Sequence, residues 1–141
     1  MENPAWEEVE QCIDEFFCME KGEEIRDPHR MLFFADNALI SRQSLKHVVE
    51  RRSLNDGMGA SLIKSFIRKA AYAVNSPDVV MENHNNKYPA SRLFGRFDVE
   101  INKGIMVVVD GENGKTGRVI TIFLKKTSQF VRLLPNNKNS P

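Results

Sequence analysis

The spacing of apolar residues predicts helices in the first half of the chain. A helix is expected over residues 4–20, where apolar residues recur at helical intervals between acidic ones: Trp6, Val9, Ile13, Phe16 and Phe17. A second helix is expected to begin near Ser41, because Ser41 or Ser44 can cap it. The third, over residues 58–74, has the clearest apolar stripe, with Lys64, Arg68 and Lys69 outside it.

Beyond Pro77 the helical rhythm gives way to patterns typical of strands. A short strand is predicted over residues 78–83, and the alternation of Phe97, Val99 and Ile101 with charged residues predicts a half-buried strand. Two more strands are expected at 104–110 and 117–126, joined by a loop rich in turn formers. The apolar run 31–40 fits no single state, and residues 127–134 fit a short helix or an edge strand.

Helices followed by strands with hairpin-length connections indicate an α+β fold. We expect N-terminal helices packed on an antiparallel sheet of about four strands. The predicted organisation is an acidic helical segment over residues 1–36, an α+β domain over 37–134 and a disordered tail over 135–141.

The net charge of +1 hides a division of charge along the chain. Residues 1–36 hold 11 acidic against 3 basic residues, and residues 37–141 hold 8 against 17. A basic body of this size suggests a polyanionic partner, because neutralising phosphates gives affinity without sequence specificity. The alternative interpretation is that the two parts pair with each other, so that the acidic segment covers or flanks a basic cleft.

Several function classes find no support in the sequence. No apolar run approaches the length of a membrane-spanning helix, and the first residues lack the pattern of a secretion signal, so a cytoplasmic protein is expected. Cys12 and Cys18 lie six residues apart on the predicted first helix, a spacing awkward for a disulfide. The histidines stand apart from one another and from the cysteines, and residues 110–115 resemble no phosphate-binding loop before a helix. No metal or cofactor is therefore predicted.

The segment Ser41 to Arg52, SRQSLKHVVERR, combines an apolar stripe with candidate chemistry. At 100° per residue, one side of the helix carries three apolar residues and the other side carries His47, Glu50 and Arg51. Arg52 falls within the apolar stripe, so it must extend past its neighbours or be held by a carboxylate or by backbone carbonyls. The simple interpretation is a solvated face with a surface histidine and an ordinary Glu–Arg pair.

The late strand, RVITIFLKK, carries a hydroxyl among apolar residues. Thr121 shares strand parity with Val119, Phe123 and Lys125, so one face is expected to show a hydroxyl and an ammonium group. The alternative is that Thr121 is present only because threonine forms strands well.

The stretch 83–96 mixes basic and aromatic residues in the way that proteins use to hold single-stranded RNA. Lys87, Tyr88, Arg92 and Arg96 are the candidates. His84 is a second candidate acid–base group, for which a plain loop histidine is the alternative.

Taken together, LKHVVERR, the helix to Val74 and the strand GRVITIF followed by SQFVRLL resemble the small toxin nucleases of the barnase, EndoU, colicin and RelE type, especially their phage-associated branch. That branch has a Lys-His-basic helix motif before a sheet whose late strand reads Val-Val-Thr-aromatic. Here the strand reads Val-Ile-Thr-Ile-Phe, so the aromatic comes one residue late. The resemblance covers roughly residues 40–134.

The resemblance implies a metal-independent ribonuclease, often a tRNA-cleaving toxin with a cognate inhibitor protein. Such cleavage, by attack of the 2′-hydroxyl, needs an acid or base, for which we choose His47, and cations to stabilise charge on phosphorus. Arg51 would stabilise that charge, Thr121 would orient a phosphate oxygen, and Glu50 would orient His47, act as a base or simply pair with a basic neighbour. The candidate substrate-binding residues are Lys87, Tyr88, Arg92, Arg96, Lys125, Lys126 and Ser128.

Two other functions remain open at this stage. A non-catalytic nucleic-acid-binding or phage-borne inhibitor protein would use the same basic surface without cleaving a bond. An interaction module would use the acidic helix around Trp6 to bind a partner or a second copy in a homodimer.

Overall fold

The computed structural model describes residues 4–11, 31–83, 87–111 and 116–134. The predictions made for Cys12, Cys18, His29 and His84 lie outside these ranges. So do those made for residues 12–20 of the first helix, for most of the loop after residue 110 and for the tail.

The described residues form four α-helices, a 3-10 turn and six strands. The helices are α1 (Pro4–Gln11), α3 (Arg42–Asp56), α4 (Ala60–Asn75) and α5 (Thr127–Phe130), the last continued by the 3-10 turn η1 (Val131–Leu133). The strands are β1 (Met31–Ala35), β2 (Ala38–Ser41), β3 (Val79–Glu82), β4 (Ser91–Asp98), β5 (Lys103–Asp110) and β6 (Gly117–Lys126).

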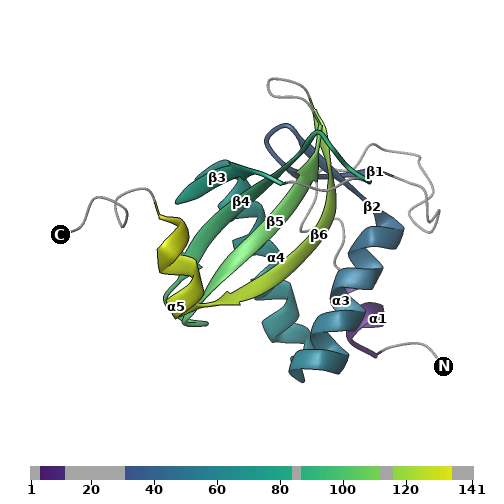
Figure 1. Ribbon diagram of the computed structural model, residues 1–141. Coiled ribbons are helices and arrows are strands. Elements are labelled where there is room, and N and C mark those ends of the chain that lie inside the picture. Colours follow the sequence, from purple (N-terminus) through teal and green to yellow (C-terminus); the bar gives the residue numbers. More distant parts are fainter. Residues whose placement is uncertain (1–3, 12–30, 84–86, 112–115, 135–141) are drawn as a thin grey trace.

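The α+β class is confirmed, and the sheet is larger and less regular than predicted. It has six strands in the order β1-β2-β6-β5-β4-β3 (Figure 1). The two extra strands come from the run 31–40, which forms an antiparallel hairpin whose turn contains Asn37 at a φ of 59°. β2 pairs with β6 in parallel, so the sheet is mixed rather than antiparallel. The domain boundary expected after residue 36 falls within this hairpin.

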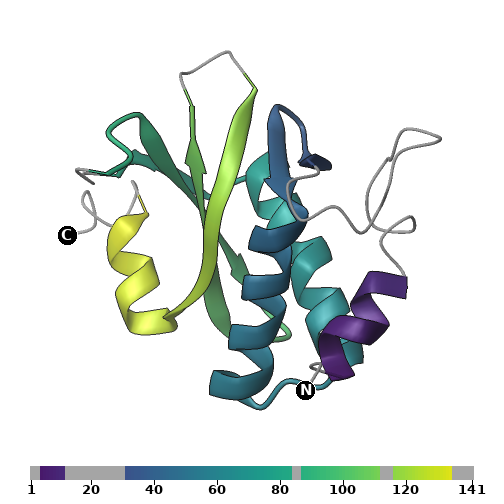
Figure 2. The ribbon, with the colours of Figure 1, turned by 90° about the vertical axis from the view of Figure 1, so that its right-hand side faces the viewer.

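α3 and α4 cover one face of the sheet, and α1 packs on the far side of these helices from the sheet (Figure 2). The core between the layers includes Ile63, Phe66 and Ile67 of α4 with Ile105 and Val107 of β5. Each such side chain contributes roughly 1.5–3 kcal/mol when fully buried.

α1 belongs to the same hydrophobic core as α3 and α4. Its Trp6 and Val9 are buried, and ion pairs join Glu10 to Arg42 and Glu8 to Lys64. The described part of the acidic segment therefore pairs with the back of the helical layer.

α5 packs on the opposite face of the sheet, with Phe130 fully buried. Gly95 and Gly104 lie beneath this ring, and a Cβ at either position would overlap it or come within 3.0 Å of it. The two glycines therefore allow the aromatic side chain to rest directly on the strand backbone.

β4 is shorter than the predicted alternation of Phe97, Val99 and Ile101. It ends at Asp98, whose carboxylate accepts a hydrogen bond of 2.8 Å from the backbone N–H of Ile101. This local bond favours a turn over strand continuation, and Val99 is 82% exposed in that turn.

Candidate active site between α3 and β6

The N-terminus of α3 is fixed by a serine cap. Ser41 has an extended backbone conformation, and its Oγ accepts a hydrogen bond of 3.1 Å from the backbone N–H of Ser44. The helix ends at Gly57, which has a φ of 65° and donates its backbone N–H to the carbonyl of Arg52. Both ends of the helix are thus set by local interactions.

The rotation of α3 about its axis follows from its buried stripe. Leu45, Val48 and Val49 are buried as predicted, and Arg52 is buried with them. The NH1 group of Arg52 lies 2.7 Å from an oxygen of Asp56, one turn later. A carboxylate therefore holds this arginine inside the apolar stripe, which leaves the opposite side of the helix, with His47 and Arg51, exposed.

The strand facing α3 has an outer edge that no strand of the described residues covers over most of its length. β2 pairs with β6 only at Gly117 and Arg118, and then leads into α3. α3 runs beside β6 from that point (Figure 2). In a strand, backbone N–H and C=O groups point to both sides, so part of the main chain of residues 119–126 faces α3.

A β-bulge turns Thr121 away from the core. In the pairing with β5, Val119 is opposite Val109 and Thr121 is opposite Val108, so Ile120 is an extra residue. Val119 is buried in the helix-covered core, and Thr121 points to the other face. The predicted shared parity of Thr121 and Val119 is therefore wrong, because an inserted residue shifts the alternation by one position.

α3 and the bulged part of β6 enclose a pocket of about 260 Å³. Its lining residues are Ser44, His47, Val48, Arg51, Ile120, Thr121 and Ile122. The structure thus brings together three of the four candidate catalytic residues, His47, Arg51 and Thr121, from elements far apart in the sequence. This placement makes the three side chains neighbours and does not by itself assign a catalytic role to any of them.

Three polar side chains of this pocket, those of His47, Arg51 and Thr121, have no partner within the part of the chain that the structure describes. Among the described residues, none forms a hydrogen bond or ion pair with the side chain of His47, Arg51 or Thr121. The pocket therefore offers a permanent guanidinium charge, an imidazole and a hydroxyl beside the apolar side chains of Val48 and Ile122. Such donors next to an apolar wall suit an oxyanion, since the low local dielectric strengthens each contact.

Glu50, the fourth candidate catalytic residue, does not line the pocket. On a helix, Arg51 lies about 40° to one side of His47 and Glu50 about 60° to the other. The pocket is on the Arg51 side. Within the described residues Glu50 also forms no ion pair, so the expected helix pair with a basic neighbour is not formed.

Arg92 and Arg96 lie on the helix-covered face of β4, opposite Val109 and Ile105 of β5. The Cζ of Arg96 stands 4.4 Å from the ring centroid of Tyr72 on α4, and its NH1 donates a 2.7 Å hydrogen bond to the carbonyl of Ser76. The structure places these two candidate substrate-binding residues two strands away from β6, so it does not bring them to the pocket.

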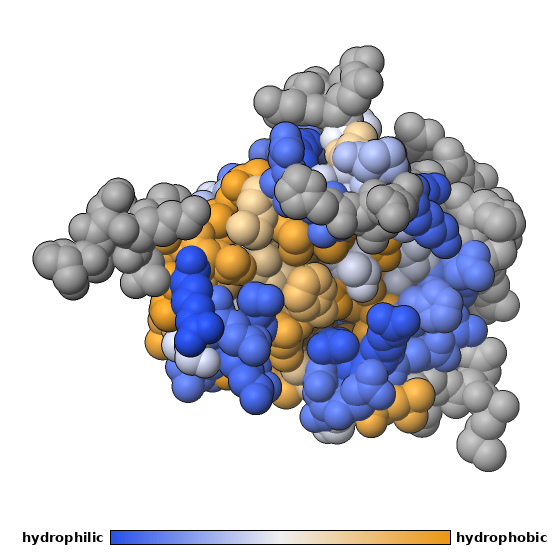
Figure 3. Space-filling view, viewed as in Figure 1, coloured by the Kyte–Doolittle hydropathy of each residue, from blue (hydrophilic) through white to orange (hydrophobic). Residues whose placement is uncertain are grey.

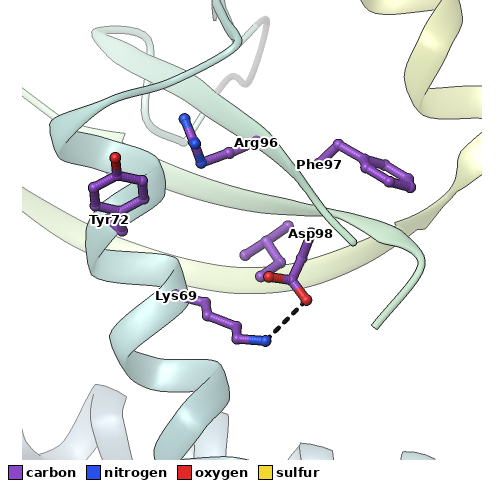
Figure 4. A pocket seen from close by; sticks show the side chains of 6 residues that line it. Lys69, Tyr72, Arg96, Phe97 and Asp98 are labelled. Carbon is purple, nitrogen blue, oxygen red and sulfur yellow. Dashed lines mark hydrogen bonds and ion pairs between the residues drawn. The ribbon is translucent and has the colours of Figure 1, made fainter. Parts of the chain in front are cut away.

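A small second pocket of about 30 Å³ adjoins Arg96, and is lined also by Lys69, Tyr72, Phe97, Asp98 and Ile105 (Figure 4). It has room for about one water molecule. The Nζ of Lys69 lies 3.0 Å from Asp98 and 3.3 Å from Glu100. Burial lowers the pKa of Lys69, but hydrogen bonds to these two carboxylates outweigh it and raise the pKa above 10.5. Paired charges and little space indicate a structural role.

The remaining candidates for substrate binding lie at the ends of β4 and β6. Lys87 stands 5.5 Å from the ring centroid of its neighbour Tyr88, before β4. Lys125 and Lys126 end β6 and Ser128 is exposed on α5. Neither Lys125 nor Lys126 forms an ion pair within the described part of the chain.

The sheet face between α3 and α5, called the open face below, carries Val108, Thr121, Phe123 and Lys125. In Figure 3 apolar surface gathers over the strands of this face, and hydrophilic residues border it on both sides. The pocket of His47 lies at its α3 edge. A chain lying on the open face would therefore meet an apolar floor first and the pocket at one side.

Ser44 is a pocket residue that the sequence analysis considered only as a helix cap. Its Oγ accepts a 2.9 Å hydrogen bond from the hydroxyl of Ser41. A helical wheel could have grouped Ser44 with Arg51, because the two residues project only about 20° apart around the helix axis. Only the position of β6 showed that this sector faces a pocket.

Comparisons with models of protein families, with curated proteins and with solved structures found no match for this chain. Over the described ranges, His, Cys, Asp and Glu residues form no group of three or more that would hold a metal ion. No helix there has the length and hydrophobicity needed to cross a membrane.

Proposed function

We propose that this protein is a metal-independent endoribonuclease that cleaves RNA, with tRNA as the first substrate to test, by attack of a ribose 2′-hydroxyl on the adjacent phosphorus. The single observation that carries the proposal is the pocket in which His47, Arg51 and Thr121 meet, none of them with a side-chain partner in the described ranges. The resemblance of the same segments to toxin nucleases supports it, and implies a cytoplasmic toxin with a cognate inhibitor.

The chemistry requires a proton acceptor, a proton donor and stabilisation of negative charge. Attack by the 2′-oxygen forms a 2′,3′-cyclic phosphate and breaks the bond to the 5′-oxygen, which leaves with a proton. Among the described residues that line the pocket, His47 is the side chain suited to general acid–base catalysis, so it takes one transfer and water takes the other. Arg51 binds the non-bridging oxygens through its fork of donors, and Thr121 orients one of them.

The surroundings of the pocket favour a bound polyanion. Lys125 continues the open face beyond Thr121 and adds positive charge along the path that a nucleic acid would follow, and Lys126 adds a further positive charge at the end of β6. Phe123, which is half-buried on the open face, supplies apolar surface against which unpaired bases can lie.

The proposal is tested by incubating the protein with total tRNA in EDTA and analysing the fragments. The wild type should give fragments with cyclic phosphate ends, and His47→Ala should reduce the rate by at least about 100-fold. Gln43→Ala, on an exposed position one turn earlier, is the matched control and should cleave normally. Intact RNA at high concentrations of folded wild-type protein would refute the proposal.

A second candidate function is non-catalytic nucleic-acid binding, including that of a phage-borne inhibitor protein. One observation favours it: the pocket holds one titratable group, whereas many ribonucleases need two. In that case RNA would remain intact, binding would weaken steeply with salt, and His47→Ala would leave the affinity unchanged.

A further inference from the structure

We infer that Ser44 is a phosphate-binding residue of the pocket, and that Ser41 holds its hydroxyl in the donating orientation. The inference deepens the proposed function and rests on it for the identity of the phosphate as part of RNA. The geometry itself concerns an oxyanion of any source.

The hydrogen bonds at the start of α3 leave one donor unused. Ser41 Oγ accepts from the backbone N–H of Ser44 at 3.1 Å and donates its own hydrogen to Ser44 Oγ at 2.9 Å. A serine hydroxyl has one hydrogen to donate. Ser44 therefore receives a hydrogen bond at its oxygen, and its own hydrogen finds no acceptor among the described residues.

This arrangement differs from the usual behaviour of a serine in a helix. Such a hydroxyl commonly donates to a backbone carbonyl three or four residues earlier. Here Ser41 occupies the oxygen of Ser44, and Ser44 lines the pocket. A hydroxyl that accepts a hydrogen bond also becomes a better donor, because linked hydrogen bonds polarise one another.

The position of Ser44 completes a ring of donors. Ser44 and Arg51 lie two turns apart on the same side of α3, and Thr121 is presented by the strand opposite them. A tetrahedral phosphate has oxygens that can point to both walls at once. Ser44, Arg51 and Thr121 together can therefore bind the non-bridging oxygens while His47 faces the reacting bond.

The test uses inorganic phosphate, titrated into the folded protein and followed by the NMR signals of the His47 ring. We expect saturable binding to the wild type and about tenfold weaker binding to Ser44→Ala, the typical effect of losing a hydrogen bond to a charged group. Ser44→Thr, which keeps a hydroxyl, should restore the affinity. Ser53→Ala, the same change on the same helix but outside the pocket, should leave it unchanged.

The role of Ser41 as a positioning residue has its own readout. Ser41→Gly keeps most of the capping ability but removes the hydroxyl, so we expect phosphate affinity to fall about threefold with little change in thermal stability. Ser41→Thr should restore the affinity. A fall in melting temperature with unchanged phosphate binding would show that Ser41 is only a cap.

The outcomes separate this inference from the proposed ribonuclease activity. If Ser44→Ala binds phosphate as the wild type does, or if phosphate leaves the His47 signals of the wild type unchanged, the inference is wrong even when RNA is cleaved. If Ser44→Ala weakens phosphate binding but the wild type leaves RNA intact, the oxyanion site stands and the ribonuclease proposal fails.

Discussion

The α4–β4 side and the α3–β6 side of the molecule both carry cationic side chains, but these differ in their contacts. On the side of α4 and β4, Lys69 contacts Asp98 and Glu100, and Arg96 stacks on Tyr72 and bonds to the backbone (Figure 4). On the side of α3 and β6, neither Arg51 nor Lys125 has an ion-pair partner in the described ranges. Paired cations join elements of the fold, and unpaired cations remain available to a ligand.

The difference also concerns stability. Arg51 is exposed and has no carboxylate partner within the described residues, so it gains no stabilisation from an ion pair. Arg52, one residue after Arg51, shows that the same helix can provide a carboxylate where the fold needs one. The lack of such a partner at Arg51 therefore supports a functional role for this side chain.

The most direct way to break the comparison is to remove one arginine from each of the two sides. Arg51→Met should reduce RNA cleavage by about 100-fold, because it removes a donor that stabilises charge in the transition state. Arg96→Met, which removes a similar side chain from the α4–β4 side, should leave cleavage within about threefold of wild type. Equal losses in a tRNA cleavage assay would mean that the two sides do not differ in function.

Thr121→Val tests whether the hydroxyl of Thr121 contacts the substrate or whether the residue serves only to form the strand. Valine has nearly the same shape and strand preference, so the free energy of unfolding should change by less than about 1 kcal/mol. We expect cleavage to fall about tenfold through the loss of one hydrogen bond to phosphate. Unchanged cleavage by a folded variant would remove Thr121 from the site.

Stability should respond more strongly to a substitution on the α4–β4 side than to one on the α3–β6 side. Lys69→Met should lower the free energy of unfolding by about 1 kcal/mol at pH 7, because it leaves two carboxylates without their cation, whereas Arg51→Met should change it by less than about 0.5 kcal/mol. Chemical denaturation measures both values.

The Lys69 contribution should also depend on pH. Its pKa is raised in the folded state, so the stabilisation is complete below the ordinary value of 10.5 and is lost as the pH rises through the higher folded value. The difference between wild type and Lys69→Met should therefore disappear at strongly alkaline pH. A difference that is constant across this range would assign it to packing.

The smallest expected effect concerns the salt dependence of RNA binding. Lys126→Gln should weaken affinity a few-fold and reduce the slope of log affinity against log salt by about 1, if that ammonium contacts a phosphate. Lys103→Gln is a control that also removes one unpaired cation, on the neighbouring strand β5. Equal changes in both variants would indicate a diffuse field rather than a contact.

Much of the fold follows from local patterns in the sequence. The helical stripes placed α3 and α4, and the buried Arg52 was evident from its position among Leu45, Val48 and Val49. The parallel pairing of β2 with β6 was not accessible, because it joins residues nearly eighty positions apart and depends on where the helices pack. The hairpin before α3 was left open because a short apolar run fits a buried helix as well as a strand.

The residues of the site could be predicted on each helix or strand separately, but the arrangement of these elements around the pocket could not. His47 and Arg51 could be placed on one side of α3, but a helical wheel does not show which sector faces a strand. The bulge at Ile120 could not be read from the sequence either, and it decides the direction in which Thr121 points. Arg92 and Arg96 were grouped with the site on composition, whereas the strand order puts them on β4, two strands away from β6.

The early departure of β2 from β6 has a further consequence for how this pocket can change. One of its walls is partly peptide backbone, which keeps its donors and acceptors whatever side chains are substituted. Substitutions can therefore change the affinity of this pocket and its chemistry. The backbone groups that could pair with an extended polar chain would remain, because the topology of the sheet exposes them.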